Sequence, residues 1–208
     1  MLNRKQSERV IESGGFLRSI LFCALGITAL AWQNADAATV DSGAVDLTPE
    51  PTTYNIEGTA GNLVFFRAGS TLIKYAPPWP ISGRNDCAQL AAPFPHAQVE
   101  IRRVETQKPL DFTDDRALVE FAKKQIPKDA EAVECGSLAR NPVRIDGKET
   151  AELVVSYSFF GRRVRLSTLI TQRAAGTELF LFQIATAPHD FKSAHRAFQA
   201  SLYSITGF

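Results

Sequence analysis

The segment 148–208 restricts the fold more than any other part of the chain, because it holds three long apolar runs separated by very short connections. The runs span residues 151–160, 164–173 and 178–187. The connections fall at Gly161 and at 174–176, and connections this short force neighbouring strands to run antiparallel. The last run is apolar on both faces, which predicts a central strand of a sheet that is covered on both sides.

An amphipathic helix is predicted after the third run, with Pro188, His189 and Asp190 at its start. The side chains expected on its inner face recur at helical spacing, so the helix should pack on the sheet. They are Phe191, Ala194, His195, Phe198, Leu202 and Ile205.

Earlier residues predict the remaining elements of a single α+β domain over 62–208. Further strands are expected at 63–66, 72–75, 97–104 and 129–140. The first two are separated by a Gly-containing turn, which is typical of a β-hairpin. A helix capped by Thr113 and ended by Pro127 is expected before the last of them. The predicted architecture is an antiparallel sheet with helices packed on it.

The first 37 residues have the three parts of a secretory signal peptide. Basic residues precede a short apolar run at 20–32, and Ala35 and Ala37 form the small-residue pattern of a cleavage site. The run is shorter than the roughly 20 residues that a membrane-spanning helix needs. We predict cleavage after Ala37, a periplasmic or secreted location and no membrane span in the mature chain; an uncleaved anchor is the alternative. Residues 38–61 are expected to form an extended tail, since they are rich in turn-forming residues.

Cleavage at that position would leave two cysteines, Cys87 and Cys135. An even pair in an exported protein predicts a disulfide, and two unpaired thiols are the alternative. Cys87 lies in the Pro-rich segment 76–95, which is expected to be a long loop fastened by this bridge. No C-x-x-C spacing is present, so a redox function is not predicted.

The order of the predicted elements resembles the fold family of PsbP, Mog1 and DcrB. The likeness rests on a mid-chain helix, a Gly turn before KETAELVVSYSF (148–159), two more strands and a closing helix in HDFKSAHRAFQASLYSI (189–205). It covers about residues 60–208 and implies an α/β/α sandwich that ends on a helix. Members of this family serve as photosystem extrinsic subunits, nuclear-transport cofactors or bacterial envelope proteins. The export signal favours the envelope members.

Charge and motif content exclude several classes of function. A formal net charge of +1 creates no field that would attract nucleic acid or an anionic membrane. The chain has no G-x-S-x-G, P-loop, H-E-x-x-H or G-x-G-x-x-G motif, and its three histidines are not spaced as metal ligands. We therefore predict that the protein has no catalytic residues, binds no metal or cofactor and has no nucleic-acid partner. No feature of the sequence indicates an oligomeric state.

Two surfaces are candidates for binding. Trp79 and Phe94, among the prolines of the segment 76–95, predict an apolar aromatic surface for a partner protein or a small ligand. The alternative is that Trp79 fills the edge of the core. Arg163 and Arg165, on the polar face of the middle apolar run, predict a basic patch for an acidic partner. The alternative there is an ordinary solvated strand face.

Together these features predict an exported, non-catalytic envelope protein that acts as a binding or accessory module for another protein or a small hydrophobic ligand. One alternative is a hydrolase whose site is assembled from dispersed residues, with His96, His189 and Asp190 as the first suspects. Another is a subunit of a membrane complex, held by an uncleaved N-terminal helix.

Overall fold

The computed structural model describes residues 43–56, 59–173 and 176–208 of the chain. All of them belong to one unit, which spans residues 40–208. The predicted signal peptide, with its cleavage site after Ala37, lies outside the described residues, as does the beginning of the expected tail. In the part of the chain that is described, neither helix combines the length and the hydropathy needed to cross a membrane.

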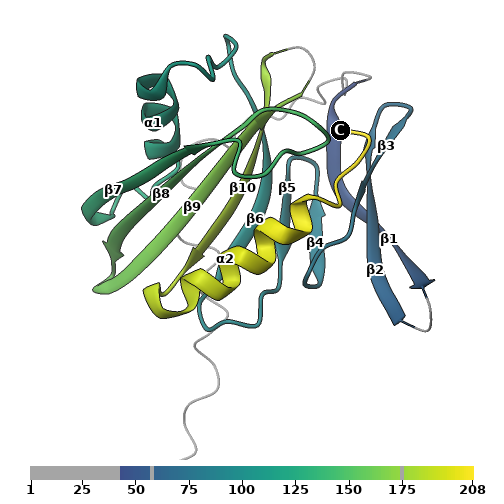
Figure 1. The fold of residues 1–208 in the computed structure, drawn as a ribbon, viewed down its shortest axis with the longest axis horizontal. Coiled ribbons are helices and arrows are strands. Elements are labelled where there is room, and N and C mark those ends of the chain that lie inside the picture. Colours follow the sequence, from purple (N-terminus) through teal and green to yellow (C-terminus); the bar gives the residue numbers. More distant parts are fainter. Residues whose placement is uncertain (1–42, 57–58, 174–175) are drawn as a thin grey trace, which may run out of the picture. The chain divides into compact units, whose positions relative to one another are not determined.

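Seven strands form one antiparallel sheet in the order β4-β5-β6-β10-β9-β8-β7 (Figure 1). Their bounds are β4 Ile81–Arg84, β5 Cys87–Leu90, β6 Gln98–Glu105, β7 Glu131–Arg140, β8 Thr150–Phe159, β9 Arg162–Gln172 and β10 Glu178–Thr186. The three strands predicted from the segment 148–208 are confirmed as β8, β9 and β10. The turn between β8 and β9 has positive φ angles at Phe160 (47°) and Gly161 (72°), which match the twist of a tight hairpin.

Strand β10 is buried on both faces, as predicted for a run that is apolar throughout. Phe180 and Phe182 belong to the larger hydrophobic cluster on one face of the sheet. Leu181 belongs to the smaller cluster on the other face, because successive side chains of a strand point to opposite sides. The strand therefore separates the two cores of the protein.

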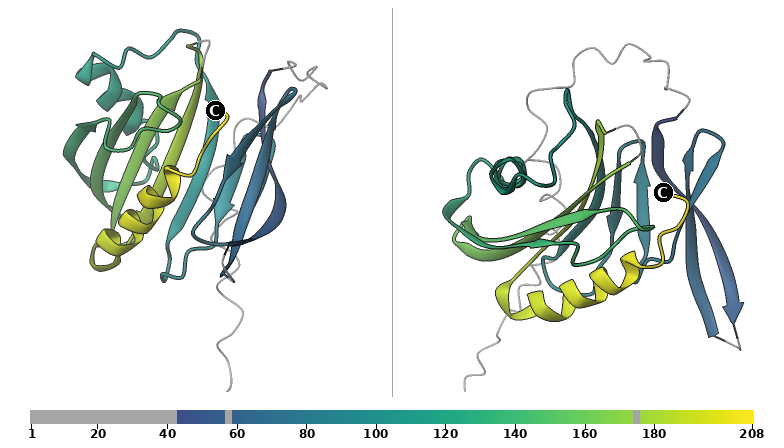
Figure 2. Two further views of the ribbon diagram at one scale, coloured as in Figure 1. Left: turned by 45° about the vertical axis from the view of Figure 1, so that its right-hand side comes forward. Right: turned by 45° about the horizontal axis from the view of Figure 1, so that its top comes forward.

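The two helices lie on opposite faces of the seven-stranded sheet (Figure 2). Helix α2 (Pro188–Leu202) begins with a proline, which suits the first helical position. Its buried residues are Phe191, Ala194, Phe198 and Leu202, which confirms the predicted inner face. Helix α1 (Asp115–Lys123) buries Leu118 and Ala122 on the other side. The predicted α+β class is confirmed.

The cap of α1 lies one residue later than predicted. Thr113 was expected to cap the helix, but Asp114 does so. Its side chain accepts hydrogen bonds from the amides of Arg116 (2.9 Å) and Ala117 (3.1 Å). Thr113 instead donates its amide and hydroxyl hydrogens to Asp111, each at 2.7 Å. A carboxylate is also favoured over a hydroxyl at this position by the helix dipole.

A second sheet, of three antiparallel strands in the order β1-β2-β3, precedes the first one in the chain. The strands are β1 Val45–Ile56, β2 Thr59–Ala68 and β3 Thr71–Tyr75. The hairpin of β2 and β3 is confirmed, whereas the extended tail expected over 38–61 is corrected. Within that segment Val45–Ile56 form a strand paired with β2, and its first buried residues, Val45 and Leu47, join the larger hydrophobic cluster.

The segment 76–95 also differs from the prediction of a long loop. It contains the hairpin of β4 and β5, which forms one end of the seven-stranded sheet. Each strand has only four residues, and the hairpin lies between Pro80 and Pro93, so no apolar alternation is visible over a useful length. The hairpin is held by its neighbours: Ala88 and Leu90 are buried in the larger cluster, and β5 pairs with β6.

The predicted Cys87–Cys135 disulfide is not formed: both cysteines are free. Cys87 begins β5 and Cys135 lies in β7, and four strands stand between these two in the sheet. At about 4.8 Å per strand the separation along the sheet is about 24 Å. A disulfide requires Cα atoms within about 7 Å of each other. The sheet order therefore corrects the prediction.

Candidate functional site

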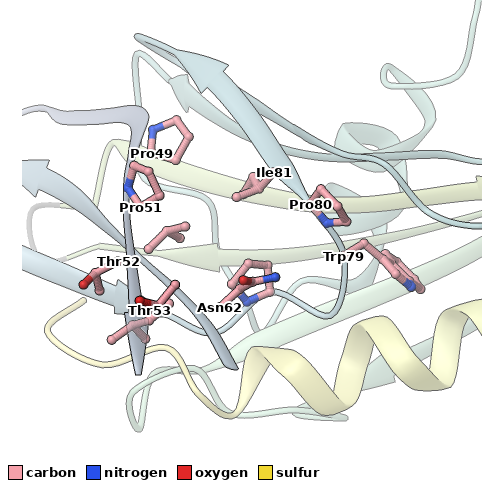
Figure 3. Close-up of a pocket in the computed structure, with 11 residues that line it drawn as sticks. Pro49, Pro51, Thr52, Thr53, Asn62, Trp79, Pro80 and Ile81 are labelled. Carbon is pink, nitrogen blue, oxygen red and sulfur yellow. The ribbon is translucent and has the colours of Figure 1, made fainter. Parts of the chain in front are cut away.

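A groove of about 560 Å³ opens between the three-stranded sheet and the segment that leads into β4 (Figure 3). It is lined by Pro49, Pro51, Thr52, Thr53, Asn62, Leu63, Val64, Pro77, Trp79, Pro80 and Ile81. In Figure 3, Trp79 lies beside α2, and Pro80 and Ile81 lie between it and the prolines of β1. We call this feature the Trp79 groove.

Trp79 is held in place by the prolines around it and by two aromatic rings. Pro77 and Pro78 end β3 and turn the chain away from the sheet, because proline cannot donate to a strand ladder. The indole ring stacks on Phe198 of α2, with centroids 6.5 Å apart, and meets the Phe94 ring edge-on at 6.1 Å. Trp79 thus covers the edge of the core and also forms a wall of the groove. The Phe94 ring packs edge-on against the indole ring and does not line the groove.

The opposite wall is built by β1 and β2, which the sequence did not predict as part of a site. Pro49 and Pro51 are two residues apart on β1, at the edge of the three-stranded sheet. Thr52 and Thr53 follow on the same strand. The P-x-P spacing was the available signal, since prolines two apart on an edge strand face the same side. From the sequence alone, the turn-forming residues around these prolines predict a tail.

The lining is apolar and uncharged. None of the side chains that form it is acidic, basic or a histidine, and its polar side-chain groups are two threonine hydroxyls, the Asn62 amide and the Trp79 indole N–H. Such a surface can bury apolar groups and offer a few neutral hydrogen bonds. It has no side chain able to transfer a proton near neutral pH. The groove is therefore suited to binding and not to acid–base chemistry.

Arg163 and Arg165 do not form an open basic patch. The Arg163 guanidinium pairs with the Glu134 carboxylate at 2.5 Å. The Arg165 guanidinium lies over the Phe191 ring, 4.6 Å from its centroid, which is a cation–π contact between β9 and α2. Arg140, at the other end of the sheet, pairs with Asp115. These partners agree with the alternative of a solvated, ion-paired strand face.

The residues suspected for a hydrolase do not form a catalytic constellation. His189 is 78% exposed, and its Nε2 lies 3.0 Å from Asp190 Oδ2. His96 is in the exposed connection before β6 and hydrogen-bonds to neither of them in the described structure. Across the described residues, no three His, Cys, Asp or Glu side chains are placed to hold a metal ion.

A buried polar cluster under α2 was missed at the sequence level. Glu152 of β8 is 5% exposed and accepts hydrogen bonds from Ser167 Oγ of β9, from His195 Nε2 (2.5 Å) and from Gln199 Nε2 (2.9 Å). A serine nucleophile must be reachable by a substrate, and Ser167 is only 2% exposed. Here the carboxylate separates Ser167 from His195, and its three donors satisfy it. The cluster anchors α2 to the sheet, and no signal in the sequence pairs residues 43 positions apart.

Comparison with known proteins leaves the chain without a family. No family model matches it, and no curated protein matches it. Fourteen chains of solved structures match. One is a protein of unknown function, PA94, from Pseudomonas aeruginosa, with a TM-score of 0.45 and 17% identity over 76% of this chain and 96% of that one. A likeness at this level identifies neither a family nor a function.

Proposed function

We propose that this protein is an exported, non-catalytic binding module of the bacterial envelope, and that the Trp79 groove is its binding site. The single observation that carries the proposal is an aromatic and proline-lined groove of about 560 Å³ with no charged side chain. Exposed concave apolar surfaces of this kind are the usual sites for partners and small ligands.

Two further features support the proposal. The rings of Trp79, Phe94 and Phe198 hold one another, so the groove wall is formed before any ligand arrives. A preformed wall avoids the entropic cost of ordering side chains on binding. The buried Glu152 carboxylate under α2 is bonded internally to Ser167, His195 and Gln199, so it offers no free group to a ligand.

The location and the fold family are parts of the same proposal. The signal-peptide pattern of residues 1–37 supports export to the periplasm or secretion, with a soluble chain from Ala38 onward. The order of strands and the closing helix support kinship with the PsbP, Mog1 and DcrB fold, as an α/β/α sandwich to which the three-stranded sheet is added. The N-terminal residue of the mature protein, measured by mass spectrometry of periplasmic extracts, tests the export: a chain that begins before Ala38 contradicts it.

Trp79 itself reports on binding to the groove. The chain has two tryptophans, so in the full chain with Trp32→Phe all indole fluorescence comes from Trp79. We expect its emission to shift and saturate when either uncharged peptides or a neutral amphiphile below its micellar concentration is added. Thr52→Lys places a charge in the groove and should weaken this binding at least tenfold.

A matched control is Thr71→Lys, at a threonine on β3 that is also exposed but does not line the groove. It should leave the binding unchanged. If neither class of probe changes the Trp79 emission, or if both lysine variants lose binding equally, the groove is not the site.

A further inference from the structure

Phe160 occupies a position at which a bulky side chain is unfavourable. It is the first of the two residues in the turn between β8 and β9, which is closed by the pair Phe159 and Arg162. Its φ angle of 47° lies in the left-handed region, where turns of this kind normally place Asn, Asp or Gly. Phe160 is also 71% exposed, so burial in the core does not offset the cost of this conformation. Such an outlier points to a role for the side chain outside the fold.

A second residue in the left-handed region lies beside this turn, next to another exposed apolar side chain. Strand β7 has a bulge after Glu131, where Ala132 has a φ angle of 49° and Val133 is 44% exposed. Glu131 pairs with the residue two positions before Phe160, so the beginning of β7 and the turn lie together at one corner of the sheet (Figure 1). We call Phe159, Phe160 and Val133 the Phe160 corner.

The corner has an aromatic tip that is fixed to the core. The Phe160 ring packs on the Phe159 ring, with centroids 4.4 Å apart. Phe159 in turn packs against the smaller hydrophobic cluster. A Cβ atom added to Gly161 would meet no atom within 4 Å, so the turn projects beyond the packed part of the sheet.

The charges around the corner balance one another. Arg163 pairs with Glu134 at 2.5 Å. Four further exposed charged residues lie there, two of each sign: Lys128, Asp129, Glu131 and Arg162. Arg162 directly follows the turn, where its guanidinium can bond to a phosphate while the neighbouring ring is buried. A corner with both signs of charge is complementary to a surface that also carries both, such as zwitterionic lipid headgroups.

The size and shape of the corner argue for a lipid surface and against a protein partner. A stable protein–protein interface buries about 800 Å² on each side. A phenylalanine side chain buries about 150–250 Å², so Phe160 with the half-buried Phe159 and Val133 supplies about half of that area. A bilayer interface takes up projecting aromatic rings without a matching pocket.

We propose that the Phe160 corner inserts into the interface of a lipid bilayer, with the Phe160 ring below the headgroups and Arg162 at the level of the phosphates. This inference goes beyond the proposed function and does not depend on it. The corner lies at the β7 end of the seven-stranded sheet, whereas the Trp79 groove includes Ile81 at the β4 end. A bilayer at the corner therefore leaves the groove accessible to its ligand.

Quenching of an indole at position 160 tests the insertion in the full chain. With Trp32→Phe, Trp79→Phe and Phe160→Trp, all indole emission comes from residue 160. Vesicles of phosphatidylcholine brominated on its acyl chains should reduce this emission at least twofold relative to unbrominated vesicles. A membrane contact made by residues 1–37 does not produce this signal, because the quencher must meet residue 160 itself.

A matched control places the indole at Tyr203 in the same background. Tyr203 is an exposed aromatic residue after α2, close to the antiparallel bridge that joins Thr206 to Lys74 of β3 and away from the corner. Its indole should not be quenched. Equal quenching at both positions would mean that the protein meets the vesicle without a preferred side, which overturns the proposal.

A second reporter separates the Phe160 ring from the rest of the corner. Val133→Trp in the same background should also be quenched, and addition of Phe160→Asn should abolish that quenching. Asparagine suits the left-handed turn, so the urea midpoint of the Phe160→Asn protein should equal or exceed that of its parent. Loss of quenching in a protein that is no less stable assigns the effect to the ring and not to the fold.

The remaining outcomes decide between occupants of the corner. Quenching in pure phosphatidylcholine is expected, because the corner has no net charge to be attracted. If quenching requires added phosphatidylglycerol, electrostatic attraction carries the contact and insertion of the ring is overturned. If neither residue 160 nor residue 133 is quenched in any vesicle, the corner does not enter lipid, and a protein becomes its partner instead.

Discussion

The two cysteines show how position in the sheet decides the chemistry of a side chain. Burial raises the pKa of the Cys87 thiol to about 11; Glu100 and Asp86 add to the shift, and Arg102 opposes it. Cys135 is exposed on β7. Only the thiolate reacts with alkylating reagents, and at pH 8 a thiol of pKa about 11 is ionised to about one part in a thousand.

Thiol labelling should therefore distinguish the two residues. In the full chain with Cys23→Ser, we expect iodoacetamide at pH 8 to modify Cys135 at least tenfold faster than Cys87, because Cys87 is half-buried and protonated. Peptide mass mapping over time measures both rates, and Cys135→Ser assigns the slow one. Unfolding in urea without reductant should make both react quickly. If labelling of the denatured protein finds no free thiol, Cys87 and Cys135 are joined by the predicted disulfide.

Helix α2 is the element whose attachment to the sheet is most fully defined. Phe198 is 2% exposed and stacks on Trp79, so it belongs both to the core and to the wall of the groove. Further along the helix, His195 and Gln199 bond to the buried Glu152. The helix is thus fixed by an apolar face and by a polar cluster side by side.

Removal of the Phe198 ring should loosen α2. We expect Phe198→Ala to reduce the free energy of unfolding by about 3–5 kcal/mol, the usual cost of deleting a buried phenyl ring. Urea unfolding followed by circular dichroism measures this change. Tyr203→Ala, at a residue that is 64% exposed just after the helix, is the control and should stay within about 0.5 kcal/mol of the wild type. A cost below about 1 kcal/mol for Phe198→Ala would contradict the packing described here.

Elements with their own periodicity could be predicted from the sequence, and elements that depend on neighbours could not. Strand β10 and helix α2 each contain a complete apolar pattern over nine or more residues. Strands β4 and β5 have four residues each and are stabilised by packing against the rest of the sheet. The same holds for the site: Trp79 was evident as an isolated aromatic residue, whereas Pro49 and Pro51 reach the groove only through the pairing of β1 with β2.

On the scale of the whole described unit, the start of β1 joins the two sheets. Asp46 Oδ1 accepts hydrogen bonds from the Asn85 amide in the β4–β5 turn (2.9 Å) and from the amide and hydroxyl of Thr48 (2.8 and 2.6 Å). Burial acts to raise the pKa of Asp46. The hydrogen bonds from Thr48 and Asn85, with a smaller contribution from Arg103, outweigh it, so the pKa lies below its usual value.

This joint should weaken in acid. A carboxyl whose pKa is lower in the folded state stabilises the fold above its unfolded pKa of about 3.9, and this contribution is lost as the pH falls through the folded pKa. We expect Asp46→Asn to be less stable than the wild type at pH 6 and the difference to shrink between pH 5 and pH 3. Urea midpoints measure it. Asp129→Asn, at an exposed aspartate before β7, is the control. If the stability difference for Asp46→Asn stays constant with pH, the ionised Asp46 carboxylate does not stabilise the connection between the two sheets.

The bridge between β3 and the segment after α2 has a consequence for how the chain is made. The Ala76 amide bonds to Ser204 Oγ, 128 positions later, and Lys74 pairs with Thr206 beside it. A ribosome adds about 5–20 residues per second, so about 6–26 seconds pass between the synthesis of the two partners. During that interval β3 has no cover on its outer edge. The outer edge of β3 can be covered only after α2 has been synthesised, so a chaperone has time to bind the exposed edge.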